Sequence, residues 1–201
     1  MRHKGVDKEE TRRKVFEAAG RGFRKHGYAG IGVDGLAKSA GVTSGAFYSH
    51  FGSKGGAFDV ALAAGLDEVV DGVTKFQIKH GAGWVEAFAE YYLSRSHQRD
   101  VDTGCAMATL TPDVVRSDPK VHRAYEKKMT QIVDVISAGL ADGSDEDRRA
   151  RAWAMLSVLI GGINVARAMK SVKTSDAIAK AIIPAAVKAA GLARSPAEDA
   201  P

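Results

Sequence analysis

Residues 33–51 read VDGLAKSAGVTSGAFYSHF, and their apolar spacing changes abruptly at a glycine. Apolar residues recur at helical spacing from residue 33 to residue 40, which predicts one short helix. Gly41 and the following valine then break the pattern. Thr43 or Ser44 can cap a second helix, because a side-chain hydroxyl accepts hydrogen bonds from helical N–H groups. The stretch therefore predicts two short helices joined by a tight turn.

Two such helices behind a basic first helix have the arrangement of a helix-turn-helix motif. Gly41 tolerates the positive backbone dihedral that a tight turn can require. Leu36 and Phe47 are placed to clamp the two helices together. Residues 43–45 make the start of the second helix small and polar, as the major groove of DNA demands. We place the motif at about residues 32–51.

The positive charge of the chain lies mostly in its first quarter. Residues 1–54 hold eleven Lys and Arg against five Asp and Glu, a net charge of +6, whereas the whole chain carries +5. The other 147 residues are therefore close to neutral, at −1. This distribution indicates a polyanionic partner for the first quarter alone. A solvated, charged helix is the alternative explanation of the charge taken by itself.

The rest of the chain carries apolar residues at helical spacing and lacks the alternation typical of strands. We expect an all-α protein without a membrane span or an intrachain disulfide, since no apolar run is long enough and Cys105 is the single cysteine. A cytoplasmic location with no membrane partner follows. The tail, residues 193–201, is expected to be disordered. After the motif, helices are predicted at about 54–79, 84–95, from 105, 119–141, 144–170 and 175–191.

The motif resembles the N-terminal domain of the TetR family of transcriptional regulators over about residues 9–69. The resemblance is carried by Gly27-Tyr28, by residues 33–42 and above all by Phe47-Tyr48-Ser49-His50-Phe51-Gly52-Ser53-Lys54. It implies a three-helix DNA-binding domain joined by a long helix to a ligand-sensing and dimerisation domain at residues 70–192. It also implies a homodimer on near-palindromic, double-stranded operator DNA.

Six residues are assigned to DNA by this resemblance and by their chemistry: Thr43, Ser44, Gly45, Tyr48, His50 and Lys54. Backbone amides at the helix start, the Tyr48 hydroxyl and the Lys54 ammonium suit phosphate contacts. Base reading then falls to Thr43, Ser44 and His50, with help from water. Gly32 departs from the family pattern, which has a threonine or serine there to cap the helix and contact phosphate.

Three enzyme or metal motifs were weighed against this interpretation. Gly30, Gly32 and Gly35 spell a dinucleotide fingerprint, but they follow a basic helix instead of a hydrophobic strand. Residues 117–120 match Ser-x-x-Lys, which a helix start explains better because the supporting motifs are missing. The histidines never lie three or four residues apart, as a metal site on one helix would require. We therefore expect no enzyme, no metal and no cofactor.

Cys105 has two interpretations. Free cysteine is most often a buried, inert core residue. Its position after Gly104, at a predicted helix N-terminus, favours the reactive thiolate instead. The Gly-Cys pair also resembles a subset of TetR-type regulators, some of which respond to oxidants or electrophiles. A thiol-sensing role is therefore kept beside the structural one.

Two further sets of residues are candidates for ligand binding and dimerisation, although each residue can also be plain core. The helix that begins near Trp153 is apolar on most sides and carries Gly161-Gly162 and Ala166, which suits a partner helix in a four-helix interface. Candidates for the ligand pocket are Phe76, Trp84, Phe88, Tyr91, Tyr92, Cys105, Met107, Tyr125 and Met129. Candidates for the dimer interface are Trp153, Leu156, Ile160, Ile163, Ile178 and Ile182.

The sequence thus predicts a sequence-specific transcriptional regulator of the repressor kind, released from its operator by an unknown small molecule or electrophile. In this model an effector that prefers a different spacing of the two recognition helices shifts the equilibrium away from DNA. A sequence-independent DNA-binding protein is the alternative, and an enzyme the more distant one.

Overall fold

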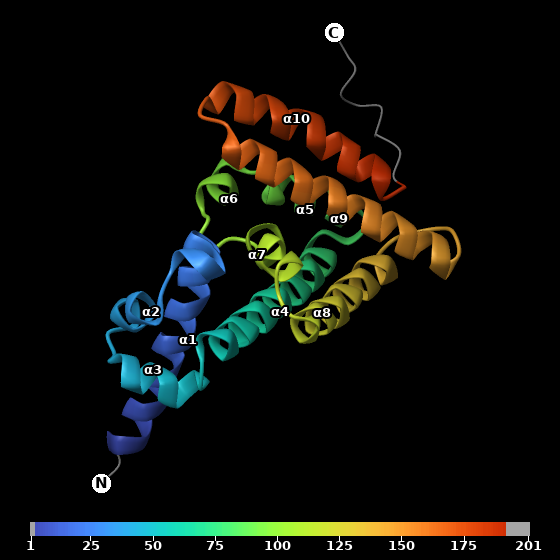
Figure 1. Cartoon of the computed structure of the whole chain (residues 1–201). Helices are drawn as coiled ribbons and strands as arrows, with labels where there is room; N and C mark the ends of the chain where they lie inside the picture. The colour runs from blue at the N-terminus through green and yellow to red at the C-terminus, as the bar shows by residue number, and fades with distance from the viewer. Residues whose placement is uncertain (1–2, 192–201) are drawn as a thin grey trace. The chain divides into compact units, whose positions relative to one another are not determined.

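The computed structural model describes residues 3–191 of the chain, with side chains from residue 9 onward, and the regular secondary structure of this part is all helical (Figure 1). The expectation of a disordered tail at residues 193–201 lies outside the described residues. No helix in the described part of the chain is long and apolar enough to cross a membrane. The helices are α1 His3–Gly30, α2 Val33–Ala40, α3 Ser44–Phe51, α4 Lys54–His80, α5 Trp84–Tyr92, α6 Arg95–Arg99, α7 Ala106–Val115, α8 Pro119–Ala138, α9 Asp145–Ala168 and α10 Val172–Ala189.

The contacts divide the chain into two compact units. The first contains the chain up to Glu68 together with Val101–Lys128, and the second contains Val69–Asp100 together with the chain from Met129. The first boundary lies next to the expected end of the N-terminal domain at residue 69. The expected domains nevertheless assigned Val101–Lys128 to the C-terminal part of the molecule, whereas its contacts are with the N-terminal helices.

Aromatic rings form the core of the first unit. Phe23, Phe47 and Phe58 are at most 2% exposed and come from α1, α3 and α4. The rings of Phe23 and Phe58 meet edge to face with centroids 5.4 Å apart, and those of Phe47 and Phe51 lie 4.8 Å apart. Since aromatic pairs add to the burial of apolar area, these contacts explain how four short or basic helices form a stable unit.

Helix α7 joins the first unit because two glycines let it approach closely. A side chain at Gly65 of α4 would begin 2.6 Å from the Cβ of Ala106 on α7, so only glycine leaves room. Gly27 breaks the regular geometry of α1 with φ 70° and ψ 172°, and the Asp113 carboxylate of α7 lies beside it. Gly27 is thus a kink, after which α1 continues to Gly30.

Ion pairs continue this attachment along the first half of α8. Lys120 pairs with Asp59 at 3.2 Å, and Lys128 pairs with Asp67 of the same helix, α4. Both pairs span 61 residues, so the two helix segments run side by side in the same direction. Such partly exposed pairs contribute little stability each, but they set the register between the helices.

In the second unit, α9 and α10 pack through a glycine. A Cβ at Gly162 would lie 2.5 Å from a methyl carbon of Ile182, which leaves no space for any other residue. Gly161 has nothing within 4 Å and faces away. The close approach predicted from the Gly161-Gly162 pair is therefore found within this chain, at Gly162 alone.

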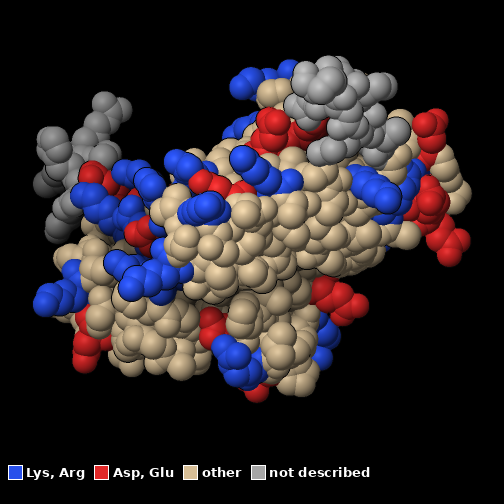
Figure 2. Space-filling view, turned by 90° about the horizontal axis from the view of Figure 1, so that it is seen from above, with Lys and Arg blue, Asp and Glu red and all other residues tan. Residues whose placement is uncertain are grey.

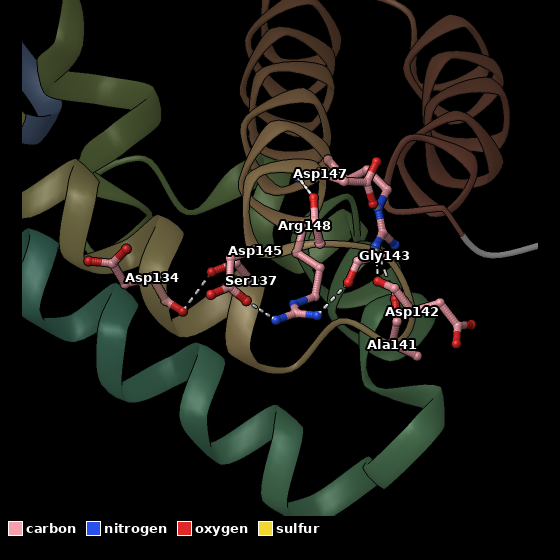
Figure 3. Close-up of polar contacts among 10 residues, drawn as sticks. Asp134, Ser137, Ala141, Asp142, Gly143, Asp145, Asp147 and Arg148 are labelled. Carbon is pink, nitrogen blue, oxygen red and sulfur yellow. Dashed lines mark hydrogen bonds and ion pairs between the residues drawn. The ribbon is translucent and has the colours of Figure 1, made fainter.

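The connection between α8 and α9 is fixed by arginines. Arg151 donates to the carbonyl oxygens of Ala141 at 3.0 Å, Asp142 at 2.5 Å and Ala190 at 2.8 Å. Arg148 donates to the carbonyl of Gly143 at 2.8 Å, as Figure 3 shows. These bonds hold residues 141–143 outside the helix, so α8 ends at Ala138, earlier than the pattern predicted.

Two other helix boundaries differ from the prediction. The helix expected over residues 84–95 is two helices, because the Ser94 side chain accepts from the His97 N–H at 3.3 Å and starts α6. The last helix begins at Val172 with Ser171 as its cap, not at Ser175. Ser175 is buried and donates instead to the Ala166 carbonyl at 3.1 Å, which ties α10 to α9.

Candidate nucleic-acid interface

The turn between α2 and α3 has the geometry that its glycine predicted. Gly41 adopts φ 69° and ψ 29°, in the left-handed region that favours glycine. Its N–H donates to the Lys38 carbonyl at 3.1 Å, and the next N–H, of Val42, donates to the Ala37 carbonyl at 3.0 Å. These two bonds close the end of α2 in the manner of a Schellman motif. Gly41 therefore sets the angle at which α3 leaves α2.

Leu36 and Phe47 anchor the two helices in the core. Each side chain is 0% exposed. Packing on the inner side of α3 leaves its opposite side, including Tyr48 at 49% exposure, open to solvent. The predicted clamp residues and the predicted outward residue therefore lie on opposite faces of one eight-residue helix.

Thr43 caps α3, and Ser44 begins it. The Thr43 hydroxyl accepts from the Ala46 N–H at 3.2 Å. Of the two predicted cap residues, Thr43 and Ser44, the structure therefore has Thr43. Ser44 donates to the Asp34 carboxylate of α2 at 2.6 Å. Gly45 is exposed and carries no side chain, so backbone can approach DNA closely there. Asp34 was not among the predicted site residues, because only the folded turn brings it to Ser44.

Lys54 is held in place at the start of α4 by an aromatic ring. Its ammonium nitrogen lies 4.5 Å from the centroid of the Tyr28 ring, a cation–π contact. Tyr28 in turn packs on Phe58, with centroids 5.3 Å apart. Tyr28 is therefore a supporting residue for the predicted phosphate contact of Lys54. The Gly27-Tyr28 pair in the sequence was the signal for it.

Gly32 and His50 occupy the remaining predicted positions of the motif. No side chain caps α2, whose N-cap residue is Gly32, and the space beside that glycine is open for 4 Å. The capping bond expected from a threonine or serine is thus absent among the described residues of this turn. His50, in the last turn of α3, is half-buried.

The aromatic pocket candidates of the second unit form one cluster of rings. Phe88 lies 5.4 Å from Phe76, 6.4 Å from Trp84 and 5.7 Å from Tyr92 between ring centroids, and Phe76 lies 5.3 Å from Tyr91. Trp84, Phe88 and Tyr92 are buried, and the Trp84 indole donates to the Gly139 carbonyl at 2.9 Å. Packing within the unit accounts for these three residues. Met129 belongs to the same unit and is buried.

Cys105, Met107 and Tyr125 belong instead to the first unit. Cys105 is half-buried and stands at the N-cap of α7, as predicted. Burial raises the pKa of the Tyr125 hydroxyl; its bond to the Thr111 hydroxyl at 2.7 Å opposes this effect, and electrostatic interaction with Cys105 adds to it. Met107 is buried in the core.

Each unit has a hollow, and neither is lined by the predicted pocket residues. The hollow of the first unit, about 290 Å³, lies along α1 and α4 and contains the Arg24–Glu68 ion pair at 2.6 Å. The hollow of the second unit, about 260 Å³, is lined by Arg95, Arg99 and Arg167. The ligand-pocket assignment stays a prediction.

The dimer candidates on α9 and α10 fall into two groups. Leu156 and Ile163 are at most 1% exposed and pack inside their own chain. Ile160, Ile178 and Ile182 are half-buried, and Ile182 faces Gly162. Only Trp153 is exposed, at 41%. A contact between chains is therefore open to Trp153, while burial within the chain accounts for Leu156 and Ile163.

The outer side of α9 has no charged group over four turns. Residues 152–166 contain no Lys, Arg, Asp or Glu, and Val165 is 51% exposed on that side. Figure 2 shows an uncharged area on the face seen from above, with charged side chains around it. Trp153 was among the predicted dimer residues, but Ser157, Gly161 and Val165, which are exposed at the same helical spacing, were not, because α9 is apolar on most sides and its outward face cannot be told from the sequence.

Known proteins match the chain over different lengths. A curated relative, the HTH-type transcriptional repressor SCO4008 of Streptomyces coelicolor, is 29% identical over 86 residues, which are 43% of this chain and 44% of that protein. The structure of SCO4454, a TetR-family regulator from Streptomyces coelicolor, matches with TM-score 0.72 and 20% identity over 91% of this chain and 95% of that one. Reduced NemR of E. coli matches with TM-score 0.71 and 17% identity over 86% and 95%.

The structural matches show the fold, and the chain spans less than half the length of its curated relative. Residues 15–65 match the family of bacterial regulatory proteins named tetR. This segment contains α2, α3 and the Tyr28–Lys54 contact described above. Over this segment, the chain is similar to the TetR family of bacterial regulatory proteins.

Proposed function

We propose that the chain is a homodimeric transcriptional regulator that binds a specific operator sequence in double-stranded DNA and represses transcription from it. The observation that carries the proposal is the exposed start of α3 beside a preorganised Lys54. Thr43, Gly45 and Tyr48 are exposed and Ser44 is half-buried, on a helix whose other side is buried. Such a helix fits the major groove, while the backbone amides of its first turn and Lys54 suit phosphate.

A homodimer is supported by the uncharged outer side of α9. An apolar surface that includes Trp153 and Val165 favours contact with another apolar surface over contact with water. A second copy offers the same surface, and two-fold symmetry places it face to face with itself. The dimer then presents two copies of α3 to two half-sites about 34 Å apart.

Competition in a gel-shift assay tests operator binding. Full-length protein at moderate salt is titrated onto DNA taken from upstream of its own gene, with unlabelled bulk DNA as competitor. Preference for the upstream DNA is expected, and Tyr48→Phe, which keeps the ring and removes the hydroxyl, weakens it. Equal competition by bulk DNA refutes an operator and supports sequence-independent binding, which rests on phosphate alone.

A small molecule or electrophile is proposed to release the operator, and Cys105 is the candidate sensor. Cys105 stands at the start of α7, and α7 packs on α1 within the first unit through Asp113 and Gly27. A modified thiol would therefore move an element in direct contact with the DNA-binding helices. Operator release by a reactive electrophile should disappear in Cys105→Ser. Unchanged release by that variant contradicts thiol sensing and leaves a noncovalent ligand as the signal.

Because a transcriptional regulator must reach chromosomal DNA, the proposed function also implies a cytoplasmic location. The expectation that it is no enzyme belongs to the same proposal.

A further inference from the structure

The hydroxyl of Ser44 is polarised by a carboxylate. Its oxygen lies 2.6 Å from an Asp34 carboxylate oxygen, a distance typical of a hydrogen bond between a hydroxyl and a charged acceptor. An ionised carboxylate only accepts, so the proton of this bond belongs to Ser44. A serine has one hydroxyl proton and two lone pairs. While the Ser44 hydroxyl donates its one hydrogen bond to Asp34, it can act toward DNA only as an acceptor.

The neighbouring hydroxyls of α3 have equally defined roles. Thr43 accepts from the Ala46 N–H at 3.2 Å, which leaves its own proton free to donate. Ser49 donates to the Gly45 carbonyl at 3.0 Å, so it too keeps only lone pairs for other partners. Among the serine and threonine hydroxyls at the start of this helix and along it, Thr43 therefore keeps a proton to donate, whereas Ser44 and Ser49 act as acceptors.

We infer that Asp34 is a specificity-determining residue, which makes Ser44 an acceptor for the exocyclic amino group of adenine or cytosine. This inference rests on the proposed operator binding. In the major groove, adenine N6 and cytosine N4 are the only donors of the base edges, whereas guanine and thymine present acceptors there. A Ser44 hydroxyl that can only accept therefore favours adenine or cytosine at this position over guanine or thymine. Asp34 acts through Ser44 and is a positioning residue.

The charge of Asp34 provides a second effect that must be separated from this one. A carboxylate near DNA repels phosphates and lowers affinity for every sequence alike. Asp34→Asn removes the charge but keeps a side-chain oxygen that can accept from Ser44. Asp34→Ala removes both. Only Asp34→Ala should therefore free the Ser44 proton and change which bases are preferred.

The experiment is selection of binding sites from a randomised DNA library by the full-length chain and its variants. The wild type is expected to enrich adenine or cytosine at one symmetric position of each half-site. Ser44→Ala loses the preference at that position alone. Asp34→Ala broadens the position to include guanine or thymine, while Asp34→Asn raises affinity for all sequences with the preference retained. Ser49→Ala is the matched control, since it removes another hydroxyl of the same helix and leaves that position unchanged.

Base analogues then test the individual contact. Purine in place of the selected adenine, or the cytosine analogue without its N4 amino group, should weaken wild-type binding by roughly three- to tenfold, as expected for one hydrogen bond. The same replacement should leave the affinity of Ser44→Ala unchanged. Selection of guanine or thymine at the position that responds to Ser44→Ala overturns the inference while operator binding stands. A wild type without any sequence preference refutes operator binding and this inference together.

Discussion

Lowering the pH should destabilise the second unit through His97. This residue is 8% exposed, and its ring lies between the rings of Tyr92, 5.1 Å away, and Tyr91, 5.3 Å away. Burial lowers the pKa of His97 from 6.5 to about 4, and the positive charge of Arg167 contributes to the shift. Asp100 opposes it. Folded protein therefore keeps this imidazole neutral well below neutral pH.

The sign of the effect follows from where the proton binds. Between pH 6.5 and about 4, the unfolded chain takes up a proton at His97 that the folded chain refuses. The stabilisation is thus fully present above pH 6.5 and falls as the pH drops toward 4. The lowered pKa corresponds to at most about 3 kcal/mol of stability, an upper limit because solvent at the edge of the site screens part of the effect. About 2 kcal/mol of this stability is lost by pH 5, because His97 of the unfolded chain is largely protonated there.

Urea unfolding between pH 7.5 and 5 measures this loss, with circular dichroism as the readout. His97→Phe keeps a ring between the two tyrosines and removes the titrating nitrogens, so its free energy of unfolding should depend less on pH by about 2 kcal/mol over this range. His122→Phe, at an exposed histidine, controls for the loss of a histidine as such. Parallel pH curves for the wild type and His97→Phe would refute the reasoning.

Three further substitutions test separate parts of the structure. Thr43→Ala should cost about 1 kcal/mol in the free energy of unfolding by removing the α3 cap, with Thr43→Ser restoring it; equal urea midpoints for all three proteins would contradict the cap. Gly162→Ala should lower the thermal midpoint, because its Cβ meets Ile182, whereas Gly161→Ala should not; a reversed order would show that the other glycine is the packed one. Trp153→Asp should give monomers in analytical ultracentrifugation with helix content retained, and a persistent dimer would place the interface elsewhere.

The helix-turn-helix was readable from residues 33–51 because its signals are local. A glycine at 41, a hydroxyl at 43 and apolar spacing on either side specify two helices and the turn between them, and the structure has both helices within one residue of the prediction. Lys54 and Tyr48 likewise lie where the motif predicted. The pair formed by Asp34 and Ser44 was not readable, since it joins residues ten apart across the turn.

Errors arose wherever a distant contact competes with a local signal. Ser175 looks like a helix start, but a bond to the Ala166 carbonyl uses its hydroxyl inside α10. The end of α8 was predicted too late, because the loop after it is fixed by hydrogen bonds from Arg151, which lies ten residues beyond Ala141 in the sequence. Leu156 and Ile163 looked suited to a partner chain, yet burial within their own chain accounts for them.

Short-range chemistry in the chain was thus sufficient for the fold class and for the two helices and turn of the motif, because capping, turn geometry and helical spacing act within a few residues. Tertiary packing alone decided that Val101–Lys128 joins the N-terminal helices and that α9 turns one uncharged side outward. Both outcomes depend on which surfaces meet, through contacts such as Gly65 with Ala106 and Gly162 with Ile182. A glycine in the sequence permits a close approach, but only the fold supplies the neighbour.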